Sequence, residues 1–362
     1  MELQTRLVFI DTSAYEAKNF QFGHYALGRL EKMVIEEKIH LLITDVVRSE
    51  IESHLKIFSD KAVRVLKQCQ KEASFLRAAE KSTGGGLFAS VSAEAVLDEV
   101  TEKFRALMDN GLTELVSVSA VDPVQIFNDY FSATPPFHRE SKKHEFPDAF
   151  SLAAIDAVAR SRHHRVYIVS QDGDMKAVAE ANSNFIPLGS LDELLDLVNR
   201  NDKELAELSV FADNVLQQLM DDVLTNARNK LHNAEFAPSS SGDADPELNE
   251  VKINGIRMEG IQLIDVDTDS ATYDVVFEVS LTAYYDFIDY SAAHWDKEEA
   301  IYIGLNSSSE TFLHQEQYAA TLVIGFSDGL KTDAEVSALD FDDSVFDLDL
   351  DNAQYLERFP ND

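Results

Sequence analysis

Short apolar runs alternate with helical patterns through the first two thirds of the chain, and this alternation limits the fold most. Three such runs, "RLVFI" (6–10), "IHLLIT" (39–44) and "RVYIV" (165–169), are typical of buried strands. Amphipathic stretches such as "PDAFSLAAIDAVARSR" (147–162) lie between them and predict helices. Strands that alternate with helices form a parallel sheet covered on both faces. We therefore predict a three-layer α/β domain over residues 1–200, with a helical insertion within it.

The pattern changes after a segment of small and polar residues, "APSSSGDADPELNE" (237–250). This composition predicts a linker over 237–249, which follows a helical extension over 201–236. Beyond it, Val275, Phe277, Val279 and Leu281 alternate with polar or smaller residues at period two. We predict a mostly antiparallel β domain over 250–362, either a sandwich or a small barrel.

The charge is strongly negative and unevenly distributed. The 362 residues include 65 acidic and 31 basic ones, which gives a net charge of −34. From Phe236 to the end there are 28 acidic residues and 5 lysines or arginines. Such a surface repels phosphate, so a nucleic-acid partner is expected at the first domain and not at the second.

The remaining bulk features indicate a soluble protein of the cytoplasm. The one cysteine, Cys69, excludes an internal disulfide and fits a reducing compartment. The start, "MELQTRLVFID", reaches a charged residue too early for a signal peptide. No stretch approaches the roughly 20 apolar residues of a membrane helix, so no membrane partner is expected.

Two acids follow buried strands. Asp11 comes directly after "RLVFI", and Asp172 comes shortly after "RVYIV". The carboxyl ends of parallel strands meet at one edge of the sheet, where open α/β folds place their sites. Both side chains are therefore expected at that edge.

Two further acids lie on the apolar faces of predicted helices. Glu50 shares its face with Val47 and Ile51, and Asp148 shares its face with Leu152 and Ile155. An unpaired carboxylate on such a face is costly unless a cation or hydrogen bonds meet it. The sequence thus predicts that Asp11, Glu50, Asp148 and Asp172 converge, with Asp174 as a fifth acid. Clustered carboxylates suit Mg²⁺ or Mn²⁺, and a site of this kind suits phosphodiester hydrolysis.

Four motifs in this order resemble those of the PIN-domain nucleases. They are "FIDTSAY" (9–15), "ITDVVRSEI" (43–51), "KKHEFPDAFSLAAI" (142–155) and "VSQDGDM" (169–175). The resemblance covers roughly residues 5–190 and is greatest to larger bacterial members with an extra domain. It implies that Asp11, Glu50, Asp148 and Asp172 are catalytic metal ligands, that Asp174 is a ligand or supports one, and that Ser13 and Ser170 hydrogen-bond the carboxylates. Many relatives have Asn at the position of Ser13.

The resemblance also implies the activity. Members cleave RNA, and less often single-stranded or flapped DNA, so an endoribonuclease is expected, with a bacterial toxin or phage-defence setting suggested by likeness alone. Arg139, Lys142 and Lys143 lie close to Asp148 in sequence and are predicted to bind substrate phosphates. A second basic group falls within one band of a predicted helix: Lys61, Arg64, Lys67 and Lys71. These residues would either bind substrate phosphates or form an ordinary solvated helix face, and the second interpretation is at least as good as the first.

Each acid also has a purely structural interpretation. Asp11 would cap a helix, Glu50 would lie at a boundary, Asp148 would complement a helix dipole, and Asp172 and Asp174 would cap the next helix. The alternative function is a binding scaffold that keeps the fold with little chemistry. The acidic β domain would serve as a protein-partner site, a phosphate mimic or a solubilising domain, and we favour the partner site. The sequence is also compatible with a homo-oligomer.

Overall fold

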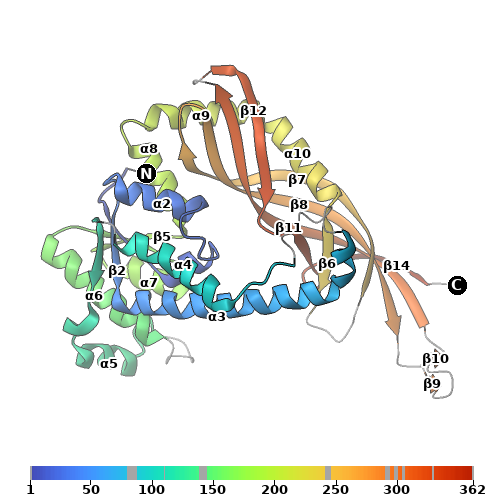
Figure 1. Cartoon of the computed structure of the whole chain (residues 1–362), viewed down its shortest axis with the longest axis horizontal. Coiled ribbons are helices and arrows are strands. Elements are labelled where there is room, and N and C mark those ends of the chain that lie inside the picture. The colour runs from blue at the N-terminus through green and yellow to red at the C-terminus, as the bar shows by residue number, and fades with distance from the viewer. Residues whose placement is uncertain are drawn as a thin grey trace. The chain divides into compact units, whose positions relative to one another are not determined.

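A computed structural model describes residues 2–79, 88–109, 111–137, 145–240, 246–289, 294–296, 301–303, 306–327 and 330–360. The chain divides into two compact units, Met1–Asp202 and Lys203–Asp362. Each unit has its own sheet and helices (Figure 1). No helix in the described part of the chain is both long enough and apolar enough to span a bilayer.

The first unit contains a five-stranded parallel sheet, as the alternating pattern predicts. Its strand order is β3-β2-β1-β4-β5, and every neighbouring pair is parallel. The strands are β1 (Leu7–Ile10), β2 (His40–Thr44), β3 (Thr113–Val116), β4 (Val166–Val169) and β5 (Phe185–Leu188). All residues of β1 and β4 are buried, because these central strands are covered on both faces.

Helices surround this sheet. They are α1 (Thr12–Glu16), α2 (Tyr25–Ile35), α3 (Asp45–Glu72), α4 (Ala93–Met108), α5 (Pro123–Phe131), α6 (Phe146–Arg162), α7 (Gly173–Ala181) and α8 (Leu191–Asn201), with the short 3₁₀ segments η1 (Ser74–Ala79) and η2 (Val118–Ala120). The helical insertion between Glu50 and Asp148 therefore holds α4 and α5, and it also supplies the edge strand β3.

The sequence patterns at 45–58 and at about 61–80 predict two separate helices, whereas the structure has the single helix α3 over Asp45–Glu72. It runs unbroken for 28 residues because no glycine or proline interrupts it. Thr44 begins it, with its side chain accepting a hydrogen bond from the Val47 backbone N–H. Figure 1 shows it as one continuous helix. Glu50 and the basic group at 61–71 consequently lie on a single rigid element.

The second unit contains a strongly paired antiparallel sheet. Its order is β12-β11-β8-β7, and β14 also pairs with β11. These strands are β7 (Glu247–Val266), β8 (Ser270–Asp289), β11 (Asn306–Ser327), β12 (Leu330–Phe341) and β14 (Gln354–Pro360). Two short pairs accompany it, β9 (His294–Asp296) with β10 (Ile301–Ile303), and β6 (Glu235–Ser239) with β13 (Val345–Asp349). The period-two prediction of a mostly antiparallel β region is confirmed.

The core of the second unit joins this sheet to two helices, α9 (Ala206–Gln218) and α10 (Met220–His232). Val275, Phe277, Val279 and Leu281 on β8 are fully buried there. Residues 203–232 fall within the helical extension that we expected over 201–236, and they pack with the β sheet. Their apolar faces need a partner surface, and the buried face of β8 provides one.

The segment that we expected to be a linker differs from that expectation. Residues 235–239 form β6, and β7 begins at Glu247. β6 pairs in parallel with β13, a partner more than a hundred residues later in the chain. Small and polar residues are compatible with such a short edge pair, and the local composition carried no sign of the distant partner.

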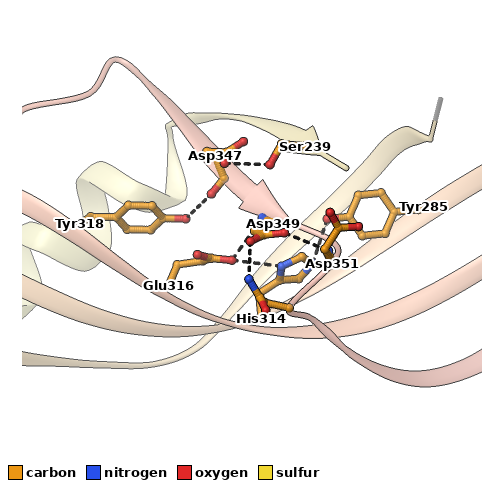
Figure 2. Close-up of polar contacts among 9 residues, drawn as sticks. Ser239, Tyr285, His314, Glu316, Tyr318, Asp347, Asp349 and Asp351 are labelled. Carbon is orange, nitrogen blue, oxygen red and sulfur yellow. Dashed lines mark hydrogen bonds and ion pairs between the residues drawn. The ribbon is translucent and has the colours of Figure 1, made fainter. Parts of the chain in front are cut away.

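A buried polar network crosses the inner face of this sheet (Figure 2). The His314 ring is fully buried; its Nε2 lies 2.9 Å from the Tyr285 hydroxyl and its Nδ1 lies 3.3 Å from Glu316 Oε1. Glu316 Oε1 also accepts a hydrogen bond from the Asp349 backbone N–H at 3.3 Å. Burial, followed by the charges of Glu316 and Asp347, raises the pKa of Tyr285, so this hydroxyl keeps its proton.

Candidate functional site

Asp11 lies immediately after β1, and two serines that are far apart in the sequence hydrogen-bond its carboxylate. Its Oδ2 accepts hydrogen bonds from the Ser13 hydroxyl, from the Ser13 backbone N–H at 3.2 Å and from the Ser170 hydroxyl at 2.9 Å. The side chain is 5% exposed. Since these donors all reach Oδ2, they set the carboxylate's orientation and leave Oδ1 to other partners.

The same serines join the loops that follow β1 and β4. The Ser170 hydroxyl accepts a hydrogen bond from the Asp172 backbone N–H at 3.0 Å. The Ser13 hydroxyl accepts one from the Gln171 backbone N–H at 3.2 Å. The two strands are neighbours in the sheet, so their carboxyl ends bring Asp11 and Asp172 to one edge.

Glu50 reaches this edge from α3. Its Oε2 accepts a hydrogen bond from the Thr12 hydroxyl at 2.7 Å, which connects the first turn of α1 to α3. Burial and the charge of Asp11 raise the Glu50 pKa, against the lowering effects of the Thr12 hydrogen bond and of His54. The charge of Asp11, at the end of β1, therefore acts on the Glu50 carboxyl of α3.

Among the acids that the structure describes in the first unit, Asp148 has the pKa that departs furthest from its ordinary value. It lies in the first turn of α6 and is partly buried. Burial raises its pKa to about 8, with further contributions, in decreasing order, from the negative charges of Asp11, Glu50, Glu145 and Asp172. Like charges oppose ionisation of a buried carboxyl, so these four neighbours add to the effect of burial. Asp148 is therefore the acid on which the charges of the other predicted ligands act.

Asp172 is an exposed residue that caps α7. Its Oδ1 accepts hydrogen bonds from the backbone N–H groups of Asp174 at 2.7 Å and Met175 at 3.0 Å. The structural interpretation of Asp172 as a helix cap therefore holds, and its charge also acts on Asp148. Asp174 lies in the first turn of α7 and is buried.

Three residues at the site went unrecognised in the sequence. Thr12 orients Glu50, and Glu145 adds a negative charge near Asp148. Tyr15 is fully buried, and burial followed by the charge of Asp11 raises its pKa. Glu145 could have been suspected from its position three residues before Asp148, but Thr12 and Tyr15 look like ordinary helix residues.

A second buried contact fixes the elements that carry the acids. The hydroxyls of Thr44, at the end of β2, and Ser151, on α6, lie 3.0 Å apart, and both side chains are buried. Because Thr44 also caps α3, this contact links the start of the Glu50 helix to the Asp148 helix. The relative position of these two acids is therefore set by packed structure and not by a loop.

The carboxylates fit a hard divalent cation by their chemistry, although they do not form a closed cage. The donor set consists of carboxylate oxygens, which Mg²⁺ and Mn²⁺ prefer, and their mutual repulsion would be relieved by positive charge. Across the described ranges, no three histidine, cysteine or acidic side chains are close enough to hold a metal ion as they stand. Mg²⁺ usually binds through one or two carboxylates and keeps several waters, so the donor set remains suitable.

The predicted phosphate-binding residues Arg139, Lys142 and Lys143 lie outside the described residues. The predicted metal ligands and the two serines all lie within them, on the elements that the motifs indicated. Asp11, Glu50, Asp148 and Asp172 are brought together, and Ser13 and Ser170 contact the carboxylate of Asp11.

Comparison with known families gives one match. The model described as the PIN domain matches residues 8–175, a range that begins in β1 and ends in α7. It includes all the acids of the cluster and both serines. No curated protein and no solved structure matches the chain.

Proposed function

The N-terminal unit of this chain belongs to the PIN-domain family, and on that basis we propose that the protein is a divalent-metal-dependent nuclease, specifically an endoribonuclease. One observation carries the proposal: Asp148 is partly buried beside other acids, so that burial first, and then the charges of Asp11, Glu50, Glu145 and Asp172, raise its pKa to about 8. A chain would not retain such repulsion at a sheet edge for stability, because uncompensated negative charges beside a partly buried carboxyl are destabilising.

The proposed roles follow from the contacts. Asp11, Glu50, Asp148 and Asp172 would hold Mg²⁺ or Mn²⁺, with Asp174 behind them. A bound ion of this type supplies Lewis-acid stabilisation of phosphoryl oxygens and an activated water. Ser13 and Ser170 orient Asp11, and Thr12 orients Glu50. The raised Asp148 pKa means that this carboxyl carries a proton near neutral pH until positive charge arrives, so metal binding is expected to release protons.

The test is cleavage of labelled RNA and labelled single-stranded DNA in Mn²⁺, in Mg²⁺ and in EDTA. We expect cleavage of RNA with either ion, slower cleavage of DNA, and none in EDTA. Asp148→Asn should abolish cleavage, whereas Asp98→Asn, an exposed acid on α4, should not alter it. Wild-type activity in Asp148→Asn, or full activity in EDTA, would contradict the proposal.

A second candidate is a scaffold that keeps the fold with little catalysis. It is favoured by the open arrangement of the acids among the described residues and by the net charge of −34. Calorimetric titration with Mn²⁺ separates the two candidates. A nuclease should bind Mn²⁺ with a heat that vanishes in Asp148→Asn, and a scaffold should give no heat that depends on Asp148.

A further inference from the structure

A stripe of four exposed cations on α3 has no part in the acidic site. Lys61, Arg64, Lys67 and Lys71 are all exposed, and we refer to them as the α3 stripe. Between residues 56 and 72 the helix has five basic and two acidic residues, in a chain with about twice as many acids as bases. This segment is therefore locally positive within a strongly negative protein.

The cations of the α3 stripe are not used in ion pairs. None of the four forms an ion pair within the described ranges, while Arg48, Lys103, Arg160 and Arg200 in the same unit each pair with an acid four residues away. Arg64 Nε donates to the backbone carbonyl of Asp60 at 3.1 Å, and the nearby Glu72 accepts from Gln68 at 2.9 Å. The positive charge of the stripe is thus available to an external partner.

The stripe runs along the same side of the helix as Glu50. At about 100° per residue, Lys61, Arg64 and Lys71 lie within about 60° of the direction of Glu50 around the helix axis. At about 1.5 Å per residue they lie about 16 to 31 Å along the axis from it. Leu55, Ser59 and Val63, which are buried, occupy the opposite side. Because α3 is a single helix (Figure 1), the stripe extends along its axis from the turn that carries Glu50 toward its C-terminal end.

We propose that the α3 stripe binds the phosphates of a nucleic-acid strand that extends away from the cleavage site. This inference rests on the proposed nuclease function and specifies its substrate as an extended single strand. A mono- or dinucleotide bound at the acidic cluster would be too short to reach the α3 stripe. Evenly spaced cations without counterions match the regular charge of a phosphate backbone. A strand of this kind also explains how a protein of net charge −34 holds nucleic acid, because the local attraction opposes the long-range repulsion.

The test compares two triple variants that remove equal charge. One, on the α3 stripe, is Lys61→Gln, Arg64→Gln and Lys71→Gln. The control, Lys203→Gln, Arg228→Gln and Lys252→Gln, removes exposed cations of the second unit. Glutamine is a good helix former and all the helical sites are solvent-exposed, so both proteins should fold. Binding of a labelled RNA of about 20 nucleotides is measured by anisotropy in EDTA over a range of salt concentrations.

We expect the stripe variant to bind about tenfold more weakly at low salt, and the slope of log affinity against log salt to fall by about 2, which is three contacts at roughly 0.7 each for a single strand. The control should match the wild type in both measurements. An unchanged slope in the stripe variant, or an equal loss in the control, overturns the proposal. Unchanged RNA binding together with lost binding of an acidic peptide would assign the stripe to a protein partner instead.

Cleavage of long and short substrates separates this inference from the proposed function. The stripe variant should cleave an RNA of about 5 nucleotides as the wild type does and should lose about tenfold in kcat/KM on the 20-nucleotide RNA. Asp148→Asn should lose cleavage of both and still bind the long RNA in EDTA. An equal loss of kcat/KM by the stripe variant on the short and the long RNA would contradict the proposal that the α3 stripe binds an extended strand. If the wild type cleaves neither RNA, the nuclease proposal fails. The anisotropy measurement still shows whether the α3 stripe binds RNA.

Discussion

Asp148 illustrates at the residue scale how a partly buried carboxyl beside other acids opposes folding once it ionises. Its pKa is about 8 in the folded protein and near 3.8 when unfolded. Between these values the folded state binds more protons than the unfolded state, so the free energy of unfolding falls as pH rises from about 4 to about 8. Stability from this residue is therefore present at low pH and is lost toward pH 8.

The first prediction follows from this sign. In EDTA at pH 8, Asp148→Asn should melt at a higher temperature than the wild type, because asparagine cannot ionise beside the other acids. At pH 4 the two should melt close together. Thermal denaturation at both pH values checks this, with Asp98→Asn as an exposed control that should follow the wild type. A lower melting temperature for Asp148→Asn at pH 8 would contradict the assigned repulsion.

The second residue-scale prediction concerns Ser170. Ser170→Ala removes the donor to Asp11 Oδ2 and the acceptor for the Asp172 backbone N–H. A buried hydrogen-bonding serine of this type costs about 1–2 kcal/mol of stability when lost. Because Asp11 would also lose its orientation, we expect about tenfold slower RNA cleavage. Urea unfolding and a cleavage assay give the two values.

Ser161→Ala is the matched control for that experiment. Ser161 is exposed, and its hydroxyl donates to the Val158 carbonyl within its own helix, α6. Neither its stability nor its cleavage rate should change. Wild-type cleavage by Ser170→Ala would show that the orientation of Asp11 does not limit the reaction.

At the scale of single elements, strand ends and helix starts carry the site in the first unit, and strand faces carry the polar network in the second. β8 presents Tyr285 to the buried side and Tyr284 to the other, because successive side chains of a strand alternate. On β11, His314 pairs with Leu281 of β8, and its ring lies on the buried side, where the Tyr285 hydroxyl reaches it (Figure 2). One strand register therefore decides which of two adjacent tyrosines can reach the histidine.

The third prediction tests this register. Tyr285→Phe leaves the fully buried His314 Nε2 without the tyrosine hydroxyl and should lower the free energy of unfolding by about 1–3 kcal/mol. Tyr284→Phe, the same change on the adjacent residue, should have little effect. Urea denaturation followed by circular dichroism measures both. Equal stabilities would mean that the network contributes nothing to the second unit.

The whole molecule consists of two units with separate sheets and separate cores. α9 and α10 bury their apolar faces in the core of the second unit, together with β8 and β11. The Asp148 cluster and the His314 network thus belong to different units. Changes in one are expected to leave the stability of the other unaltered.

The fourth prediction is that the full chain unfolds in two separable transitions. In scanning calorimetry at pH 8 with EDTA, Asp148→Asn should shift one transition upward and Tyr285→Phe should shift the other downward. The double variant should show both shifts with their single-variant sizes. A single transition that both substitutions move would indicate that the units unfold as one cooperative structure.

Much of the fold was predictable because burial leaves a local period in the sequence. Continuous apolar runs separated by helices indicated the parallel sheet, and the alternation around Val275 and Phe277 indicated the β region. The affiliation of residues 203–232 was not predictable, since an amphipathic helix shows which of its faces is apolar but not which sheet that face covers. The pairing of β6 with β13 depended in the same way on a distant partner.

The candidate site divides along the same line. The sequence by itself determined which acids follow strands or lie on apolar helix faces, because those positions depend on local periodicity: Asp11, Glu50, Asp148 and Asp172. Only the tertiary structure decided that Thr12 reaches Glu50 and that the Ser170 hydroxyl meets the same Asp11 oxygen as Ser13. The Thr12–Glu50 contact joins residues 38 positions apart in the chain, and the Ser170–Asp11 contact joins residues 159 positions apart. They depend on the packing of whole elements, which no local pattern of residues encodes.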